Sequence, residues 1–178
     1  MSKPRTLASS MIYTGRIFDL RIDEVREDDL EYKREIVVHK GSAVIVPVFD
    51  DGTVALVRQY RHAAGKFMLE VPAGSLEIDE DPLTGAIREL EEEVGVVAGK
   101  VELITEFYVS PGFLTEKMYV FLATSLTETA QNLDGDENIA IERIPLAAAV
   151  EMSGDGRIED AKSIIGLMMA GSKLGILP

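Results

Sequence analysis

The sequence predicts an α/β protein built around one hydrophobic core. Three observations lead to this class: 46% of the 178 residues are hydrophobic, several segments alternate apolar and polar residues as strands do, and others repeat apolar residues at helical spacing. Strand-like and helix-like segments follow each other in mixed order, without an internal repeat or a low-complexity tract. A chain of this length can bury the core of one compact domain with a small additional element.

The first forty residues form the additional element. Residues 16–25 and 30–39 alternate like strands, and the acidic segment 26–29 between them is turn-prone, which predicts a β-hairpin. Two strands are only marginally stable in water, so this hairpin must pack on the rest of the chain or on a second copy of it. We therefore divide the chain into an N-terminal β element, residues 1–40, expected to take part in a homodimer, and a second part, residues 41–178.

The second part opens with two β-rich runs. Residues 42–49 and 53–60 are rich in valine, and Asp51-Gly52 lies between them. Asp-Gly between two such runs is a strong hairpin signal, so we expect the two strands to pair with each other.

A helix is predicted over residues 82–94. Apolar residues recur there at helical spacing, namely Leu83, Ala86, Ile87, Leu90 and Val94. Asp81 suits the N-cap, Pro82 suits the first helical position and Gly95 suits the position after the last turn. Both ends of the helix are therefore specified by the local sequence.

The remaining elements continue the mixed order. Strands are predicted at residues 101–109, 118–123 and 139–144, and helices at residues 146–152 and 159–170. Residues 125–138 form the longest polar stretch, which we expect to be a loop.

The charge and composition limit the possible partners. The formal net charge is −13, which disfavours binding to nucleic acid and to anionic lipid surfaces. No segment approaches the roughly 18 apolar residues of a membrane span, and the absence of cysteine suits a reducing compartment. We expect a cytoplasmic protein that binds neither nucleic acid nor membranes.

Three glutamates crowd one face of the helix at residues 82–94. Glu89, Glu92 and Glu93 stand at positions i, i+3 and i+4, where like charges repel. A divalent cation would remove this conflict, and Mg²⁺ prefers carboxylate oxygens together with phosphate oxygens. The alternative is a solvated acidic helix face.

The spacing around these glutamates favours the metal site. Gly74 is followed by Glu80 after five residues, then by Arg88-Glu89-Leu90 after seven more, and the pattern ends with Glu92-Glu93 and Gly95-Val96. This pattern is that of the Nudix box, and a chance match is on the order of one in ten million. The sequence resembles the Nudix hydrolases. The proline in Ser110-Pro111-Gly112-Phe113 is similar to that of the ADP-ribose pyrophosphatase branch.

The resemblance implies a Nudix fold, in which a mixed β-sheet lies between helices, and a Mg²⁺-dependent enzyme, with Mn²⁺ as the alternative metal. It implies metal ligation by Glu89, Glu93, nearby Glu92 and the backbone carbonyl of Ala73. The other box positions are expected to be structural: Arg88 orients the glutamates, Glu80 ties the loop to the helix, and the glycines serve turns and helix ends, at Gly74 and Gly95.

The resemblance also suggests a general base and substrate contacts. Related pyrophosphatases take the base from a late loop, here residues 133–138, which favours Glu137 with Glu92, Asp136 and Asp134 as alternatives. Arginine offers a planar fork for phosphate. Arg34 and Arg61 are expected on the diphosphate, Glu116 on the terminal ribose, and Phe18 stacked on the base, although a buried core position is the alternative for Phe18.

The expected reaction is hydrolysis of ADP-ribose to AMP and ribose 5-phosphate. The same chemistry on another nucleoside diphosphate sugar, such as GDP-mannose, is the nearest alternative. A non-catalytic Nudix domain that senses a nucleotide sugar is a further one, although the chain keeps all the box carboxylates.

Overall fold

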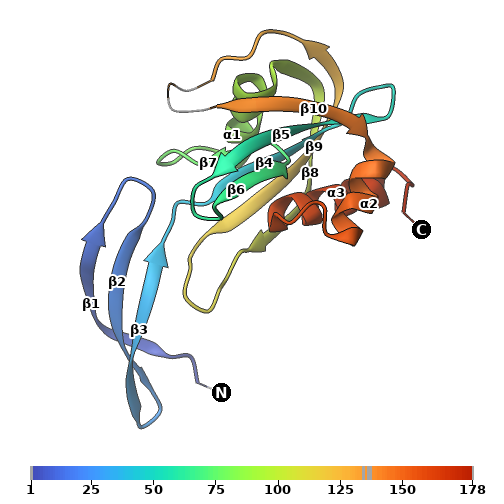
Figure 1. The fold of residues 1–178 in the computed structure, drawn as a ribbon. Coiled ribbons are helices and arrows are strands. Elements are labelled where there is room, and N and C mark those ends of the chain that lie inside the picture. Colours follow the sequence, from blue (N-terminus) through green and yellow to red (C-terminus); the bar gives the residue numbers. More distant parts are fainter. Residues whose placement is uncertain (1, 134, 136–137, 178) are drawn as a thin grey trace. The chain divides into compact units, whose positions relative to one another are not determined.

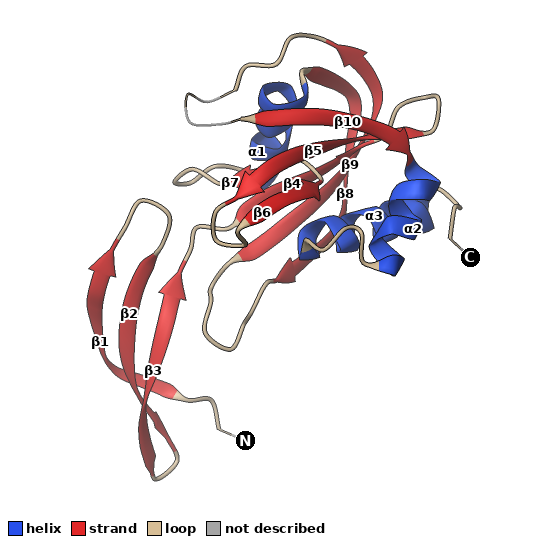
Figure 2. Cartoon of the chain, viewed as in Figure 1, coloured by secondary structure: helices blue, strands red, loops and turns tan. Residues whose placement is uncertain are grey.

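The computed structural model describes residues 2–133, 135 and 138–177. The chain divides into two compact units. We call Met1–Gly41 with Phe107–Lys117 the N-terminal unit, and Ser42–Glu106 with Met118–Pro178 the large unit. Every described helix lies in the large unit, as the colouring in Figure 2 shows.

The N-terminal unit contains a three-stranded antiparallel sheet in the order β1-β2-β3. Its strands are β1 (Arg5–Thr14), β2 (Asp19–Glu27) and β3 (Leu30–Val38). The predicted hairpin of residues 16–25 and 30–39 is confirmed as the β2–β3 pair. The sequence did not predict β1, because its apolar residues stand in adjacent groups rather than in alternation, and all ten residues are exposed.

The strands of the large unit form two sheets. One has four strands in the order β7-β4-β9-β8, namely β7 (Ala73–Ser75), β4 (Ser42–Pro47), β9 (Lys117–Glu128) and β8 (Val96–Tyr108). β4 runs antiparallel to β7 and parallel to β9, so this sheet is mixed. The other sheet is antiparallel, in the order β10-β5-β6, and contains β10 (Ile139–Pro145), β5 (Thr53–Arg61) and β6 (Lys66–Glu70).

The predicted pairing of the first two strands of the large unit is wrong. A tight turn does form, with Gly52 at φ +80°, and a single bridge joins Val48 to Val54. Beyond this bridge β4 and β5 separate into different sheets. The Asp-Gly turn thus reverses the chain, but tertiary packing decides which strands become neighbours.

Helices cover both faces of the mixed sheet (Figure 1). On one face, Ala43 and Ile45 of β4 share a core cluster with Leu90 from the helical segment that follows β7. On the other, Val46 of β4 lies against Gly166 of helix α3. All six residues of β4 are consequently buried, and the predicted sheet between helices is confirmed.

The C-terminal helices are α2 (Leu146–Asp155) and α3 (Ala161–Lys173). Both were predicted, but α3 begins two residues later than expected, because the Asp160 side chain caps it by accepting a hydrogen bond from the Ser163 amide. Strand β9 continues to Glu128 into the stretch predicted as loop. Among the described helices, none has the length and apolar character needed to cross a membrane.

Candidate active site

The helical segment predicted at residues 82–94 has two geometries. Helix α1 (Pro82–Glu89) begins at the Asp81 cap, whose carboxylate accepts hydrogen bonds from the amides of Leu83 and Thr84. From Leu90 to Val94 the chain continues as one turn of π-helix, η1, and ends at Gly95 with φ +70°. The predicted caps are confirmed, whereas the change to π geometry was not foreseen. Such turns often occur at functional sites.

The helical segment formed by α1 and η1 places acidic side chains inside the unit. Leu90 and Val94 face the core, yet Glu89 and Glu93 are also buried, at 7% and 3% exposure. Buried carboxylates are costly unless they are paired or hydrogen-bonded. Their partners therefore explain how the segment tolerates them.

Glu89 lies directly over Gly74 of β7. A Cβ atom at Gly74 would be 1.9 Å from Glu89 Oε1 and 2.2 Å from its Cδ. The φ angle of Gly74 is not in the left-handed region, so glycine is needed here for the close approach of a side chain and not for a turn.

Arg88 joins three of the box carboxylates. Its Nε and Nη2 donate to Glu80, at 3.0 and 3.2 Å. Its Nη1 donates to Glu89 Oε1 at 2.7 Å and to Glu92 Oε2 at 3.0 Å. The hydrogen bonds from Arg88 lower the pKa of Glu80, against the effect of burial, and a further bond from the Glu77 amide adds to this. The same bonds to Glu80 raise the pKa of Arg88.

Glu93 is held from the sheet side. Its Oε2 accepts a hydrogen bond from the amide of Ala73 at 3.0 Å. The two buried glutamates of the helical segment are thus held beside neighbouring residues of one short strand, since Glu89 covers Gly74 and Glu93 bonds Ala73.

The donor set suits Mg²⁺ in kind, because carboxylate and backbone carbonyl oxygens are hard ligands. As placed, Glu89 and Glu92 face Arg88 and Glu93 faces the Ala73 amide. Within the described part of the chain, no three acidic or histidine side chains are arranged to hold a metal ion.

A segment far along the chain seals the end of η1. We call Thr129–Asn132 the 129–132 segment. The amides of Thr129 and Asn132 donate to the carbonyls of Gly95 and Glu92, at 2.7 and 3.0 Å, and the Gln131 side chain donates to the carbonyl of Glu93 at 2.6 Å. These bonds satisfy carbonyls that the end of a helix leaves unpaired.

The glycine at the end of the helical segment makes this contact possible. A Cβ on Gly95 would lie 2.7 Å from the Gln131 amide nitrogen. Between the helical segment and the 129–132 segment is a groove of about 400 Å³, to which Arg88 and Glu92 contribute. The groove therefore borders two of the residues predicted from the sequence.

A cation lies in the same unit as these carboxylates. Arg61, at the end of β5, donates from Nε and Nη2 to the two oxygens of Glu70, at 2.7 and 2.8 Å. The pKa of Arg61 is raised by these hydrogen bonds and further by attraction to the charges of Glu70, Glu93 and Asp160. Of the box glutamates, Glu93 is thus one whose charge acts on Arg61.

The other predicted substrate residues belong to the N-terminal unit. Arg34 is exposed on β3, with its guanidinium 4.2 Å from the centre of the Tyr32 ring. Glu116 lies 3.7 Å from His39 Nδ1. Phe18 is 43% exposed and its ring centre is 5.9 Å from that of Tyr13, so it is not a core residue of this unit.

The candidates for the general base are only partly described. Glu137, Asp136 and Asp134 lie outside the described residues. Glu92 is described, with its side chain 32% exposed and bonded to Arg88.

Comparison with known proteins assigns the family. Residues 39–165 match the NUDIX domain family, a range that contains the whole helical segment and its partners on β7. The chain belongs to the Nudix family.

Several relatives align over most of the chain. An ADP-ribose pyrophosphatase of Bacillus subtilis is 38% identical, with 89% of this chain and 88% of the relative covered. A methanol dehydrogenase activator of Bacillus methanolicus is 35% identical, covering 92% and 90%. A GDP-mannose pyrophosphatase of Salmonella typhimurium is 32% identical, covering 93% and 94%.

A solved structure supports the fold. The crystal structure of an ADP compounds hydrolase superposes with a TM-score of 0.85 at 21% identity, covering 98% of this chain and 96% of that one. Together with the family match over residues 39–165, this superposition confirms the predicted Nudix fold.

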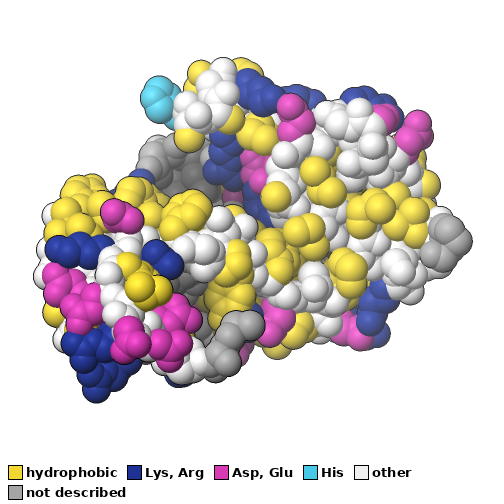
Figure 3. All heavy atoms as spheres, turned by 90° about the horizontal axis from the view of Figure 1, so that it is seen from below, with side chains coloured by type: hydrophobic (Ala, Val, Ile, Leu, Met, Phe, Trp, Pro, Cys, Tyr) yellow, Lys and Arg dark blue, Asp and Glu magenta, His cyan; other side chains and the backbone are white. Residues whose placement is uncertain are grey.

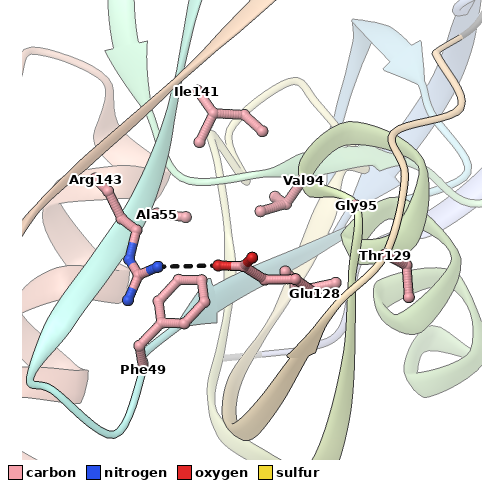
Figure 4. Close-up of a pocket in the computed structure, with 9 residues that line it drawn as sticks. Phe49, Ala55, Val94, Gly95, Glu128, Thr129, Ile141 and Arg143 are labelled. Carbon is pink, nitrogen blue, oxygen red and sulfur yellow. Dashed lines mark hydrogen bonds and ion pairs between the residues drawn. The ribbon is translucent and has the colours of Figure 1, made fainter.

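A smaller pocket of about 180 Å³ lies at the end of η1, beside Val94 and Gly95. Figure 4 shows Arg143 and Glu128 pointing toward one another there, 3.2 Å apart, with the guanidinium carbon 3.5 Å from the centre of the Phe49 ring. Arg143 also bonds Asp51 and Thr53. Arg143 of β10 thus links this strand to β9 through Glu128 and to β5 through Thr53.

Sequence reasoning missed Glu70, Lys162 and Gln131. A signal existed for Glu70, because it is a charged residue inside the apolar run from Phe67 to Val71. Lys162 and Gln131 carry no comparable local signal, since their partners are 92 and 38 residues away.

Proposed function

We propose that this Nudix protein hydrolyses the pyrophosphate bond of ADP-ribose, giving AMP and ribose 5-phosphate, and that it requires Mg²⁺. The observation that carries the proposal is the burial of Glu89 and Glu93 against one short strand. The relative named ADP-ribose pyrophosphatase, at 38% identity, supports this choice of substrate.

The box residues divide the work. Glu89 and Glu93, with Glu92 and the Ala73 carbonyl, would hold the metal. When bound, Mg²⁺ neutralises charge on the diphosphate oxygens and favours attack by water. Arg88 keeps Glu89 and Glu92 side by side, because its Nη1 donates hydrogen bonds to both. Glu80 in turn holds Arg88 by accepting a hydrogen bond from its Nε.

Substrate binding requires local positive charge in a strongly acidic chain. Arg61 would bind the diphosphate, because guanidinium binds phosphate oxygens in a fixed fork. We propose Arg34 as a second diphosphate contact, Glu116 as a contact of the terminal ribose and Phe18 as a stacking partner of the base. For the general base we propose Glu137, with Glu92 as the alternative.

We also propose a cytoplasmic homodimer that uses the N-terminal unit. Strand β1 exposes Met11, Ile12 and Tyr13, each by more than half, on both faces of its sheet. Exposed hydrophobic side chains also stand among charged ones in the view of Figure 3. Exposed apolar patches commonly mark interaction surfaces. Sedimentation should give a dimer that dissociates in the variant Met11→Asp/Tyr13→Asp, and a monomeric wild type would contradict the proposal.

The decisive experiment measures hydrolysis of a panel of nucleoside diphosphate sugars with Mg²⁺ and with Mn²⁺. ADP-ribose should give the highest kcat/KM, with AMP and ribose 5-phosphate as products. A preference for GDP-mannose would support the alternative, which the GDP-mannose pyrophosphatase relative favours. Binding without turnover of any member of the panel would indicate a sensing domain.

Variants of the box then test the assignment of the site. Glu93→Gln and Glu89→Gln should abolish turnover while the circular dichroism spectrum is unchanged, because each removes a metal-binding charge without shrinking the side chain. Glu91→Gln is the matched control on the same π-turn, where Glu91 is exposed, and should retain wild-type rates. Full activity of Glu93→Gln and Glu89→Gln would end the assignment.

A further inference from the structure

A group of four charged side chains, two of them buried, lies where β5, β6 and the start of α3 meet. We call Arg61, Glu70, Asp160 and Lys162 the Glu70 cluster. Glu70 and Lys162 are only 1% and 8% exposed, and Lys162 donates to both Glu70 and Asp160. Burying charges is costly, and apolar residues of similar volume commonly stabilise as well or better. Stability alone therefore does not account for the cluster.

The sheet register shows how far Arg61 reaches to meet Glu70. Arg61 stands opposite Lys66, whereas Glu70 stands opposite Val57. Val57 and Arg61 are four positions apart on one strand, so their side chains share a face. The Arg61 side chain thus bends back along β5 to bond Glu70 with two nitrogens. This contact fixes the orientation of the guanidinium plane.

The bond to Glu70 uses only part of the guanidinium. An arginine has five N–H groups in a rigid fork, and the bonds from Nε and Nη2 engage two of them. The Arg61 side chain is 39% exposed, while that of Glu70 is 1% exposed. Glu70 therefore binds the buried edge of the guanidinium group, and the N–H groups on the opposite, exposed edge remain available to a ligand.

Lys162 keeps Glu70 in place for this task. Glu70 Oε2 accepts from both Arg61 Nη2 and Lys162 Nζ. Burial alone would raise the pKa of Glu70, but the hydrogen bonds from Arg61 and Lys162, together with the attraction to their charges, outweigh it and lower the pKa on balance. Glu70 is therefore ionised at neutral pH.

A closed ring of bonds anchors the arrangement to the backbone. Asp160 Oδ2 accepts from Lys162 Nζ at 3.0 Å and from Ser163 Oγ at 2.5 Å. Ser163 Oγ in turn accepts from the amide of Val71 at 2.8 Å, the residue after Glu70. The cluster is thus tied to the helix cap and to the strand that carries Glu70.

We propose that Glu70 and Lys162 are positioning residues for Arg61: they hold its guanidinium so that the outer N–H groups meet the diphosphate of the substrate. This inference rests on the proposed function, because it takes Arg61 as the diphosphate contact. The two positive and two negative charges of the cluster cancel, so its net charge is zero. Its exposed member, the oriented Arg61 guanidinium, is the cation that would meet the substrate.

The charge change in Glu70→Gln separates three explanations. If Glu70 acted only through its charge, its removal would leave extra positive charge near the diphosphate and KM would fall. If Glu70 served only stability, the melting temperature would fall and KM would stay constant. If Glu70 orients Arg61, KM rises in spite of the added positive charge.

The test is a double-mutant cycle on KM for ADP-ribose at saturating Mg²⁺. Glu70→Gln and Arg61→Ala should each raise KM by about tenfold, with kcat changed by less than about threefold. The double variant should be no worse than Arg61→Ala alone, because Glu70 acts through Arg61. Glu142→Gln is the matched control: Glu142 pairs with Arg58 of the same strand β5 but is exposed, and its KM should equal that of wild type.

If Glu70→Gln folds poorly, a second double-mutant cycle with Lys162→Met replaces it. Lys162→Met should raise KM by about threefold, again without a further effect in the Arg61→Ala background. An unchanged or lowered KM in Glu70→Gln, or independent effects that multiply in the double variant, would overturn the inference. A wild type that does not hydrolyse ADP-ribose would overturn the proposed function as well, so the two failures are distinguishable.

Discussion

One added methyl group at Gly74 tests the placement of Glu89. In Gly74→Ala the new Cβ would lie 1.9 Å from Glu89 Oε1 and 2.6 Å from Oε2, whereas real Cβ contacts are essentially never below 3.0 Å. The carboxylate oxygen must therefore move by the difference between 3.0 and 1.9 Å, about 1.1 Å. A shift of this size disturbs the hydrogen bond that Oε1 accepts from Arg88 Nη1 at 2.7 Å.

The expected cost falls on catalysis more than on folding. A misplacement of about 1 Å in a reacting constellation can reduce the rate about 100-fold, so kcat should fall by about that factor. Only the flexible end of Glu89 has to move, and the backbone of β7 accepts alanine because the φ angle of Gly74 is not positive. The free energy of unfolding should fall by about 1–2 kcal/mol, through the weakened bond to Arg88.

The assay compares steady-state kinetics and urea unfolding for wild type, Gly74→Ala and a control. Gly154→Ala is the control, because no atom lies within 4 Å of its added Cβ and it should keep the wild-type rate. A wild-type kcat in Gly74→Ala would refute the argument, since Glu89 would then either lie elsewhere or be dispensable. Loss of folding would refute the claim that only a side-chain end must move.

Three further predictions follow from other contacts. Arg88→Met should lower kcat at least tenfold and the free energy of unfolding by about 1–3 kcal/mol in urea, because Glu80, Glu89 and Glu92 lose their shared partner; unchanged stability would contradict it. Leu90→Ala should cost about 2–5 kcal/mol by calorimetry, since Leu90 is fully buried, and a cost below about 1 kcal/mol would place Leu90 outside the core. The pKa of Glu70 is lowered below 4.5, so the free-energy difference between wild type and Glu70→Gln should persist down to about pH 4.5 and shrink as the pH falls further through the folded-state pKa. A difference that stays constant down to pH 3 would contradict this assignment.

Local sequence determined the elements whose ends carry their own signals. Asp81, Pro82 and Gly95 specify the two ends of the helical segment formed by α1 and η1, and the structure has all three in the expected roles. The π-turn within that helix was not predictable, because it depends on contacts with β7 and with the 129–132 segment. A pattern of apolar residues describes a face of a helix but not a change in its pitch.

Strands that depend on distant partners were predicted less well. β7 has three residues, Ala73–Ser75, too few for any alternation to be recognised, and it exists because β4 pairs with it. The turn at Gly52 was recognised, yet the separation of β4 from β5 was not, since turn chemistry says nothing about the second neighbour of a strand.

The residues of the candidate site show the same difference between local signals and contacts with distant residues. The spacing of Glu89, Glu92 and Glu93 is visible in the sequence because one helix carries all three. The Lys162–Glu70 pair joins residues 92 positions apart, so only the folded chain brings it together.

The bonds of the 129–132 segment set a boundary for remodelling this protein. Three of its donors seal the carbonyls of Glu92, Glu93 and Gly95, so lengthening or shortening the chain before Asn132 would unseat the turn that carries the glutamates. Loop grafts should therefore start after Asn132. The bonds to the end of the helical segment thus fix the chain length up to Asn132, so variation in length would have to accumulate beyond it.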